Sequence, residues 1–174
     1  MLVYFAMRVL ISAEEIRDRV AVLAQEIHRD HPDGVHLICV LKGAFVFLSD
    51  LARELPPTTT LDFMAVSRYG EGTTSSGQVR VLKDLDTPVE GRDVIIVEDI
   101  VDTGLTLHYL QEIIRARSPR HIRTACLLSK PTRRTIDLHI EYVGFTIEDK
   151  FVVGYGLDYA EQYRTLPHIA VIGD

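Results

Sequence analysis

Apolar residues between positions 13 and 29 recur at the spacing of an amphipathic helix. One face of this segment carries the apolar side chains Ile16, Val20, Leu23, Ala24 and Ile27. This spacing predicts a helix with one buried face. Ser12 and Glu15 stand three positions apart at its start, which is the pattern of a capping box. A second helix is expected over residues 44–55, because its apolar positions have helical spacing and two prolines follow it.

Short, unbroken apolar runs alternate with these helical segments. Runs of this length are typical of strands that are buried on both faces of a sheet. The strands are expected at residues 35–41, 61–67, 94–97, 121–128, 142–145 and 169–172. Residues 79–82 are expected to return along the second strand as a hairpin, and residues 103–117 to form a third helix. The alternation of strand, helix and strand predicts an α/β fold with a parallel sheet flanked by helices.

Length and hydropathy restrict the class of protein. With 174 residues, the chain is long enough for one domain that folds without disulfides or metals as staples. No apolar run approaches the roughly 20 residues of a membrane-spanning helix. The apolar opening, residues 1–7, lacks the basic start and the cleavage site of a signal peptide. It is interpreted as a first strand or arm, and Met7 is an alternative start of translation.

Charge and cysteine usage point away from nucleic acid and towards the cytoplasm. The net charge is -6, whereas non-specific binding to nucleic acid needs clustered Lys and Arg. Cys39 and Cys126 both lie inside apolar runs, so buried, reduced thiols are expected. We therefore expect a cytoplasmic protein that binds neither nucleic acid nor a membrane.

Three carboxylates follow the most apolar of the expected strands. Glu98, Asp99 and Asp102 come after Val97, where we expect this strand to end. In open α/β sheets, ligands bind at the carboxyl ends of the strands. The acids are therefore candidate partners for sugar hydroxyls or for Mg²⁺.

The four residues after Asp102 open the third expected helix. They are Thr103, Gly104, Leu105 and Thr106. The glycine lets the backbone approach a ligand closely. The free N–H groups of a helix start, together with two threonine hydroxyls, form a cradle for a phosphate. A phosphorylated sugar fits this pattern, with its phosphate in the cradle and its hydroxyls on the acids.

On the residues alone, other interpretations of this segment stay open. Asp102-Thr103-Gly104 is also the triplet of aspartic proteases, although the helix-rich α/β pattern disfavours that class. The acids also suit the Mg²⁺ site of another phosphotransferase. A solvated turn between strand and helix is the plainest alternative, but it does not explain why two acids directly follow a buried strand.

The segment from Val94 to Thr106 resembles the phosphoribosyl-pyrophosphate motif of type I phosphoribosyltransferases. Both have an apolar strand, two acids, and then Asp-Thr-Gly and a hydroxyl residue. The resemblance extends over nearly the whole chain after about Arg8, and it is specifically to the hypoxanthine–guanine branch. It implies one domain over residues 1–174, with a parallel-sheet core and a small hood built from the two ends of the chain.

Two further segments resemble that family's pyrophosphate-binding residues. Leu41-Lys42-Gly43 comes at the end of an expected strand and is similar to the pyrophosphate loop. In the family this loop has a non-proline cis peptide, here expected between Leu41 and Lys42. Gly43 lets main-chain N–H groups face the diphosphate. Arg164 matches an arginine that contacts pyrophosphate.

Lys130, Phe151 and Val152 match the family's purine-binding residues. The lysine donates to the 6-oxo group of the purine, and a donor there disfavours adenine, whose 6-amino group is itself a donor. The phenylalanine stacks on the base, an interaction worth about 1–3 kcal/mol. The valine offers main-chain groups to the base edge. The preference among hypoxanthine, guanine and xanthine stays open.

Residues 67–78 are polar and match the family's mobile lid. Arg68 and Tyr69 stand near its start, where the family more often has serine before the tyrosine. Arg68 therefore offers the diphosphate a cation in place of a hydroxyl. The lid is expected to close over the site and exclude water.

The resemblance also implies a reaction, a cofactor and an assembly. A purine base replaces pyrophosphate on phosphoribosyl pyrophosphate, and Mg²⁺ is bound by Glu98, Asp99 and Asp158 together with substrate oxygens and waters. Asp102 is expected to be the general base that takes a proton at nitrogen 7 of the purine. The expected assembly is a homodimer or a homotetramer.

Two other functions share this donor-binding motif. One is a regulator that binds nucleic acid and senses nucleotides, which the acidic net charge disfavours. The other is a kinase that synthesises the donor, which needs a longer chain and a recognisable ATP site. An enzyme of purine salvage remains the preferred hypothesis.

Overall fold

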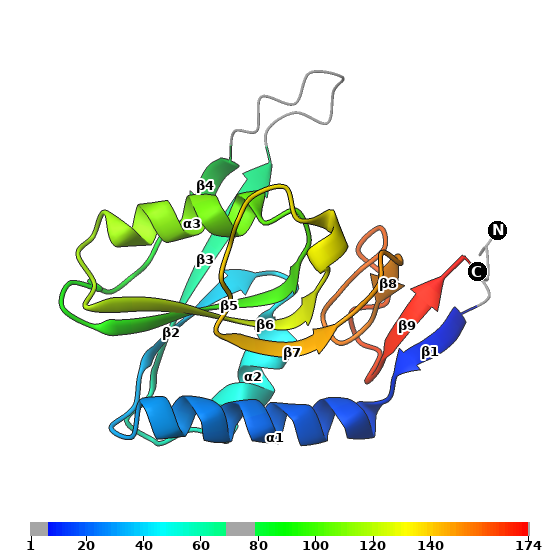
Figure 1. Cartoon of the computed structure of the whole chain (residues 1–174), viewed down its shortest axis with the longest axis horizontal. Helices are drawn as coiled ribbons and strands as arrows, with labels where there is room; N and C mark the ends of the chain where they lie inside the picture. Colours follow the sequence, from blue (N-terminus) through cyan, green and yellow to red (C-terminus); the bar gives the residue numbers. More distant parts are fainter. Residues whose placement is uncertain (1–6, 69–78, 174) are drawn as a thin grey trace.

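The computed structural model describes residues 7–68 and 79–173. Within them, the main sheet has the strand order β4-β3-β2-β5-β6-β7 (Figure 1). Its strands are β2 (His36–Leu41), β3 (Thr60–Arg68), β4 (Val79–Lys83), β5 (Asp93–Val101), β6 (His121–Ser129) and β7 (Tyr142–Thr146). β4 runs antiparallel to β3, and the other neighbouring strands are parallel. The predicted α/β fold is therefore confirmed, as is the hairpin of β3 and β4.

Helices cover both faces of this sheet. α1 (Ala13–Asp30) and α2 (Phe45–Arg53) lie on one face, and α3 (Leu105–Arg115) lies on the other (Figure 1). The predicted capping box is present: the Glu15 N–H donates to Ser12 Oγ at 3.2 Å, and the Ser12 N–H donates to Glu15 Oε2 at 2.8 Å. The predicted apolar face of α1 is buried.

Alternate residues of the parallel strands pack into two apolar cores. In β2, Leu37 and Cys39 belong to the core beneath α1 and α2, whereas Ile38 and Val40 belong to the core beneath α3. Successive strand residues point to opposite faces of a sheet, so a strand covered on both sides must be apolar throughout. This explains the unbroken apolar runs in the sequence.

The two ends of the described chain meet in a second, smaller sheet with the order β1-β9-β8. β1 (Met7–Ile11) and β8 (Val152–Val153) both pair antiparallel with β9 (Ile169–Ile172). This sheet is the hood, and it lies beside the edge of the main sheet where β6 and β7 end (Figure 1). Across residues 7–68 and 79–173, no helix has the length and apolar character that crossing a bilayer requires.

The predicted end of β5 is wrong. The strand continues past Val97 to Val101, because Glu98 pairs with Cys126 and Ile100 with Leu128 on β6. Ile100 also packs against one apolar core, so the continued strand is supported by contacts on its faces as well. Glu98 and Asp99 are therefore strand residues whose side chains alternate between faces, and not part of a loop after the strand.

Asp62 on β3 connects the main sheet to the segment between β4 and β5. Its side chain is buried, and Oδ2 accepts hydrogen bonds of 2.9 Å each from the Asp86 N–H, the Thr87 N–H and the Thr87 hydroxyl. Burial alone would raise the pKa of this carboxyl, but these hydrogen bonds and one from the Phe63 N–H outweigh it, so the pKa is lowered.

We expect Asp62→Ala to destabilise the fold by about 1–3 kcal/mol in urea unfolding at pH 7, because the donors on Asp86 and Thr87 lose their buried, charged acceptor. Since the folded-state pKa is lowered, this stability is present above the ordinary carboxyl pKa and is lost as pH falls through the folded value. The difference from wild type should therefore shrink below roughly pH 4. The exposed Asp33 serves as the control; equal effects of Asp33→Ala and Asp62→Ala would contradict the prediction.

Candidate active site

Three parallel strands of the main sheet end at one edge, and each is followed by a predicted site residue. Lys42 follows β2, Asp102 follows β5 and Lys130 follows β6. β5 lies between β2 and β6 in the sheet. Because parallel strands point their carboxyl ends the same way, residues far apart in the sequence meet at this edge.

The turn after β2 is packed closely against two other parts of the site. The peptide between Leu41 and Lys42 is cis, as expected. A Cβ atom on Gly43 would lie 1.7 Å from Asp99 Oδ2, and one on Gly156 would lie 2.0 Å from the Gly43 carbonyl oxygen. This turn can therefore lie against Asp99 on β5 and against the segment around Gly156 only because both positions are glycine.

A pocket of about 240 Å³ lies at this edge of the sheet. Its lining includes the predicted site residues Leu41, Glu98, Asp99, Asp102, Gly104 and Thr106. Burial raises the pKa of the Asp99 carboxyl to about 6; the Ile100 N–H and Arg164 oppose this rise, and the Asp158 carboxylate adds to it. A hydroxyl or a cation that binds Asp99 would favour its charged form.

The predicted phosphate cradle lies at the start of α3. The helix begins at Leu105, and Gly104 before it has a φ of 88°, a left-handed conformation that favours glycine. The turn is braced by the segment after β6: the Thr135 N–H donates to the Thr103 carbonyl at 3.1 Å, and Arg134 donates to the Asp102 carbonyl at 3.2 Å. These contacts hold the N–H groups of the helix start in place.

The predicted purine-binding residues are arranged around Lys130. Its side chain is buried, and Nζ donates to the Lys150 carbonyl oxygen at 2.6 Å. The Phe151 side chain is 53% exposed, with its ring edge-on to Tyr159 at 5.7 Å between centroids. Val152 is buried in β8. An exposed aromatic ring suits the flat face of a purine base, and the ammonium group held at the preceding residue suits a polar group on the base edge.

Arg133 is a site residue that the sequence reasoning missed. Its Nε donates to Asp102 Oδ1 at 3.0 Å, and a second nitrogen lies 3.6 Å from Asp149. Asp149 in turn lies 3.5 Å from Lys130 Nζ. Asp102 and Lys130 thus belong to one chain of ion pairs. The only signal in the sequence was the group of basic residues after β6, which has no specific motif.

Asp158 and Arg164, the two predicted site residues nearest the end of the sequence, contact each other. Arg164 donates to the Gly156 carbonyl at 2.8 Å and lies 3.3 Å from Asp158 Oδ1. Gly156 packs on Gly43, so this pair lies next to the turn after β2. Lys42 in that turn is paired with Glu161, a second residue that the sequence reasoning missed.

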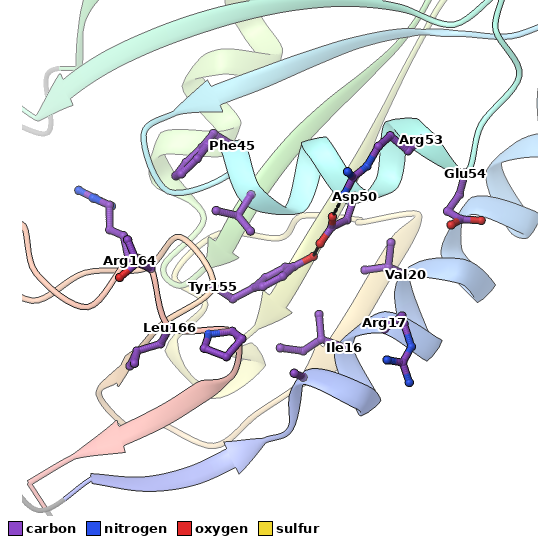
Figure 2. A pocket seen from close by; sticks show the side chains of 14 residues that line it. Ile16, Arg17, Val20, Phe45, Asp50, Arg53, Glu54, Tyr155, Arg164 and Leu166 are labelled. Atoms are coloured by element: carbon purple, nitrogen blue, oxygen red, sulfur yellow. Dashed lines mark hydrogen bonds and ion pairs between the residues drawn. The ribbon is translucent and has the colours of Figure 1, made fainter.

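A larger cavity lies elsewhere in the molecule. Figure 2 shows a pocket of about 820 Å³ between α1, α2 and the segment around residues 155–167, with the Tyr155 hydroxyl on Asp50. Arg164 is the one predicted site residue in its lining. The larger volume therefore does not mark the site, because the acids, the cradle and Lys130 all lie at the sheet edge.

The predicted lid falls at and beyond the end of β3. Arg68 is the last residue of β3, and Tyr69 with residues 70–78 of the expected lid lies outside the described residues. In the part of the chain that is described, no group of three or more His, Cys, Asp or Glu side chains has metal-binding geometry. Glu98, Asp99 and Asp158 are therefore not grouped as a metal site by themselves, and their role toward Mg²⁺ stays a prediction.

A phosphate cradle beside acids at the carboxyl edge of a parallel sheet defines a transferase that acts on a phosphorylated sugar. Residues 12–160 match the family model described as phosphoribosyl transferase domain. The chain therefore belongs to the phosphoribosyltransferase family, in its hypoxanthine-guanine branch. The fold class and the resemblance inferred from the sequence are both confirmed.

Individual relatives cover nearly the whole chain. The hypoxanthine-guanine phosphoribosyltransferase of Bacillus subtilis is 51% identical over 95% of this chain and 92% of its own length. That of Mycobacterium tuberculosis H37Rv is 50% identical, over 94% and 85%. A crystal structure of the Bacillus anthracis hypoxanthine-guanine phosphoribosyltransferase is 47% identical and covers 95% of this chain and 98% of its own, with a TM-score of 0.91.

We expect Gly43→Ala to reduce phosphoribosyl transfer roughly 100-fold in kcat/KM, because the new Cβ displaces the Asp99 carboxyl from its place. Nucleotide formation and thermal unfolding are measured in parallel. The control is Gly91→Ala: no atom lies within 4 Å of its added Cβ, and φ is +67°. That variant should lose about 1 kcal/mol of stability and keep its activity. Full activity of Gly43→Ala would contradict the close packing described above.

Proposed function

We propose that this protein transfers the 5-phosphoribosyl group of phosphoribosyl pyrophosphate to a 6-oxopurine, hypoxanthine or guanine, and releases pyrophosphate. The observation that carries the proposal is the position of Lys130. Its buried ammonium group donates to the carbonyl of Lys150, the residue before Phe151, and is linked through Asp149 and Arg133 to Asp102. This chain of ion pairs supports our proposal that Lys130 recognises the base and that Asp102 is the general base of the same site.

The donor would bind across the sheet edge. Its 5-phosphate would rest on the N–H groups and hydroxyls of residues 103–106, and its ribose hydroxyls would bind Glu98 and Asp99. Mg²⁺ is the cofactor we propose, and when bound it would neutralise diphosphate charge with Glu98, Asp99 and Asp158 as partial ligands. The main-chain groups of residues 41–43 and the guanidinium of Arg164 would stabilise the charge that develops on the leaving pyrophosphate.

The purine would stack on Phe151 with its 6-oxo group on Lys130 and main-chain groups of Val152 at its edge. The bond from nitrogen 9 to the anomeric carbon forms while the bond from that carbon to the pyrophosphate oxygen breaks. The transition state resembles an oxocarbenium ion, as in other glycosidic chemistry. Asp102 takes the proton that the purine loses, and Arg133 Nε orients this carboxylate by donating to its Oδ1 at 3.0 Å.

The proposal also covers the domain organisation, the lid, the partners and the assembly of the protein. We expect one domain over residues 1–174, with a lid over about 67–78 in which Arg68 and Tyr69 face the diphosphate. The partners are the donor and the purine base, with neither nucleic acid nor membrane involved. A homodimer or homotetramer in the cytoplasm is expected, and light scattering during size-exclusion chromatography measures the assembly.

The first experiment offers phosphoribosyl pyrophosphate and Mg²⁺ with hypoxanthine, guanine, xanthine, adenine or uracil in turn. Wild-type protein should form nucleotide from hypoxanthine or guanine and not from adenine or uracil. In the same panel, Lys130→Ala should lose about 10- to 100-fold of its preference for 6-oxopurines, because a charged donor to the 6-oxo group is removed.

The matched control is Lys83→Ala, which removes a lysine on β4 that pairs with Asp86. It should leave the preference for bases unchanged. Product from adenine or uracil alone would overturn the assignment of the base pocket, beginning with Lys130. If no base gives product while the donor still binds, the regulator hypothesis takes first place.

We expect Asp102→Asn to lower kcat by about 100- to 10,000-fold while donor binding changes little, because general-base catalysis is lost and the shape is kept. Single-turnover kinetics gives the chemical rate, and calorimetry gives donor affinity. Asp137→Asn, at an exposed acid after β6, is the control. Equal losses of rate and donor affinity in Asp102→Asn would show a binding role only.

A further inference from the structure

Glu161 contacts two cations that are far apart in the sequence. Its Oε2 accepts from Lys42 Nζ at 2.7 Å, and its Oε1 lies 3.2 Å from an Arg164 nitrogen. Lys42 belongs to the turn after β2, and Arg164 lies in the segment before β9. One carboxylate therefore uses both oxygens to join the two segments that face pyrophosphate in the proposed function.

A carboxylate and a diphosphate compete for the same donors. Each presents negatively charged oxygens to an ammonium or a guanidinium group at hydrogen-bond distance. Arg164 keeps its bond to the Gly156 carbonyl independently of Glu161, so its position does not depend on this acid. In the described part of the chain, Arg164 Nε is a buried donor with no hydrogen-bond partner, so the guanidinium still has a donor to offer an anion.

The ion pair between Glu161 and Lys42 is exposed, so another anion can readily replace Glu161 in it. The side chains are 65% and 66% exposed, respectively. Exposed ion pairs contribute little net stability, because water competes with them and salt screens them. A bound anion with several charges, held also by main-chain N–H groups, can therefore displace Glu161 from Lys42. It competes with the same carboxylate for Arg164, whose side chain is 18% exposed.

The backbone around Glu161 is held in an uncommon conformation. Ala160, Glu161 and Tyr163 have φ values of 50°, 64° and 72°, in the left-handed region that favours glycine. The Glu161 N–H donates to Asp158 Oδ2 at 2.8 Å, which helps to hold this conformation. Such residues cluster at switch regions and ligand clamps. Asp158 is also a proposed Mg²⁺ partner, so metal-bound diphosphate would compete with both the side chain and the main chain of Glu161.

We propose that Glu161 is a built-in competitor of pyrophosphate: its carboxylate pairs with Lys42 and Arg164 and must leave both before the diphosphate group can bind. This inference rests on the proposed function, because it takes Lys42 and Arg164 as pyrophosphate-binding residues. Glu161 lowers the affinity for the donor and for the product pyrophosphate, and it speeds the release of that product by returning to the two cations.

The test is Glu161→Gln, which keeps the size of the side chain and removes its charge. Binding of inorganic pyrophosphate with Mg²⁺ is measured by calorimetry, and product inhibition by pyrophosphate is measured in the hypoxanthine reaction. We expect pyrophosphate to bind roughly two- to fivefold more tightly, with a similar fall in KM for the donor and no change in KM for hypoxanthine. Glu161→Asp, which keeps the charge, should lie closer to wild type.

Glu90→Gln is the control for net charge, since Glu90 is an exposed acid just before β5; it should leave pyrophosphate affinity unchanged. Unchanged or weaker pyrophosphate binding in Glu161→Gln, with active wild-type protein, would overturn this inference alone. Equal tightening in Glu90→Gln would also overturn it, because the effect would then be general charge. Wild-type protein that neither binds pyrophosphate nor makes nucleotide would instead overturn the proposed function.

Discussion

The close approach of three backbone segments at Gly43 is the contact on which the site depends. A side chain at Gly43 would occupy the place of the Asp99 carboxyl, and one at Gly156 would meet the Gly43 carbonyl. The turn after β2, the acid on β5 and the segment before β9 can therefore share one edge of the sheet. Without this packing, the turn that carries Lys42 and the segment that carries Arg164 would not lie beside Asp99.

The acids and cations of the site are arranged in pairs. Asp102 is paired with Arg133, Asp158 with Arg164, and Glu161 with Lys42. An anionic donor can take the place of a carboxylate on such a cation without moving the cation far. The pairs therefore keep donors in position for a substrate that carries several negative charges, while the exposed pairs exchange readily.

Local chemistry made much of the fold readable in the sequence. The capping box and apolar face of α1, the unbroken runs of the parallel strands, and the strand–acid–glycine–helix order around residues 94–106 depend on neighbours in the chain, and the structure agrees with them. The predicted residues Lys42, Asp102 and Lys130 each follow a strand, so the common direction of the strands was enough to bring them together.

Tertiary packing decided the rest. β5 reaches Val101 only because β6 continues to pair with it, and no local signal marks where such pairing stops. The hood forms between strands at the two ends of the chain, whose partners are more than 140 positions apart. Arg133 and Glu161 enter the site through contacts with distant acids and cations. The sequence by itself determined the elements and the chemical groups, because these follow from periodicity and residue type; which charges face each other depended on how the elements pack.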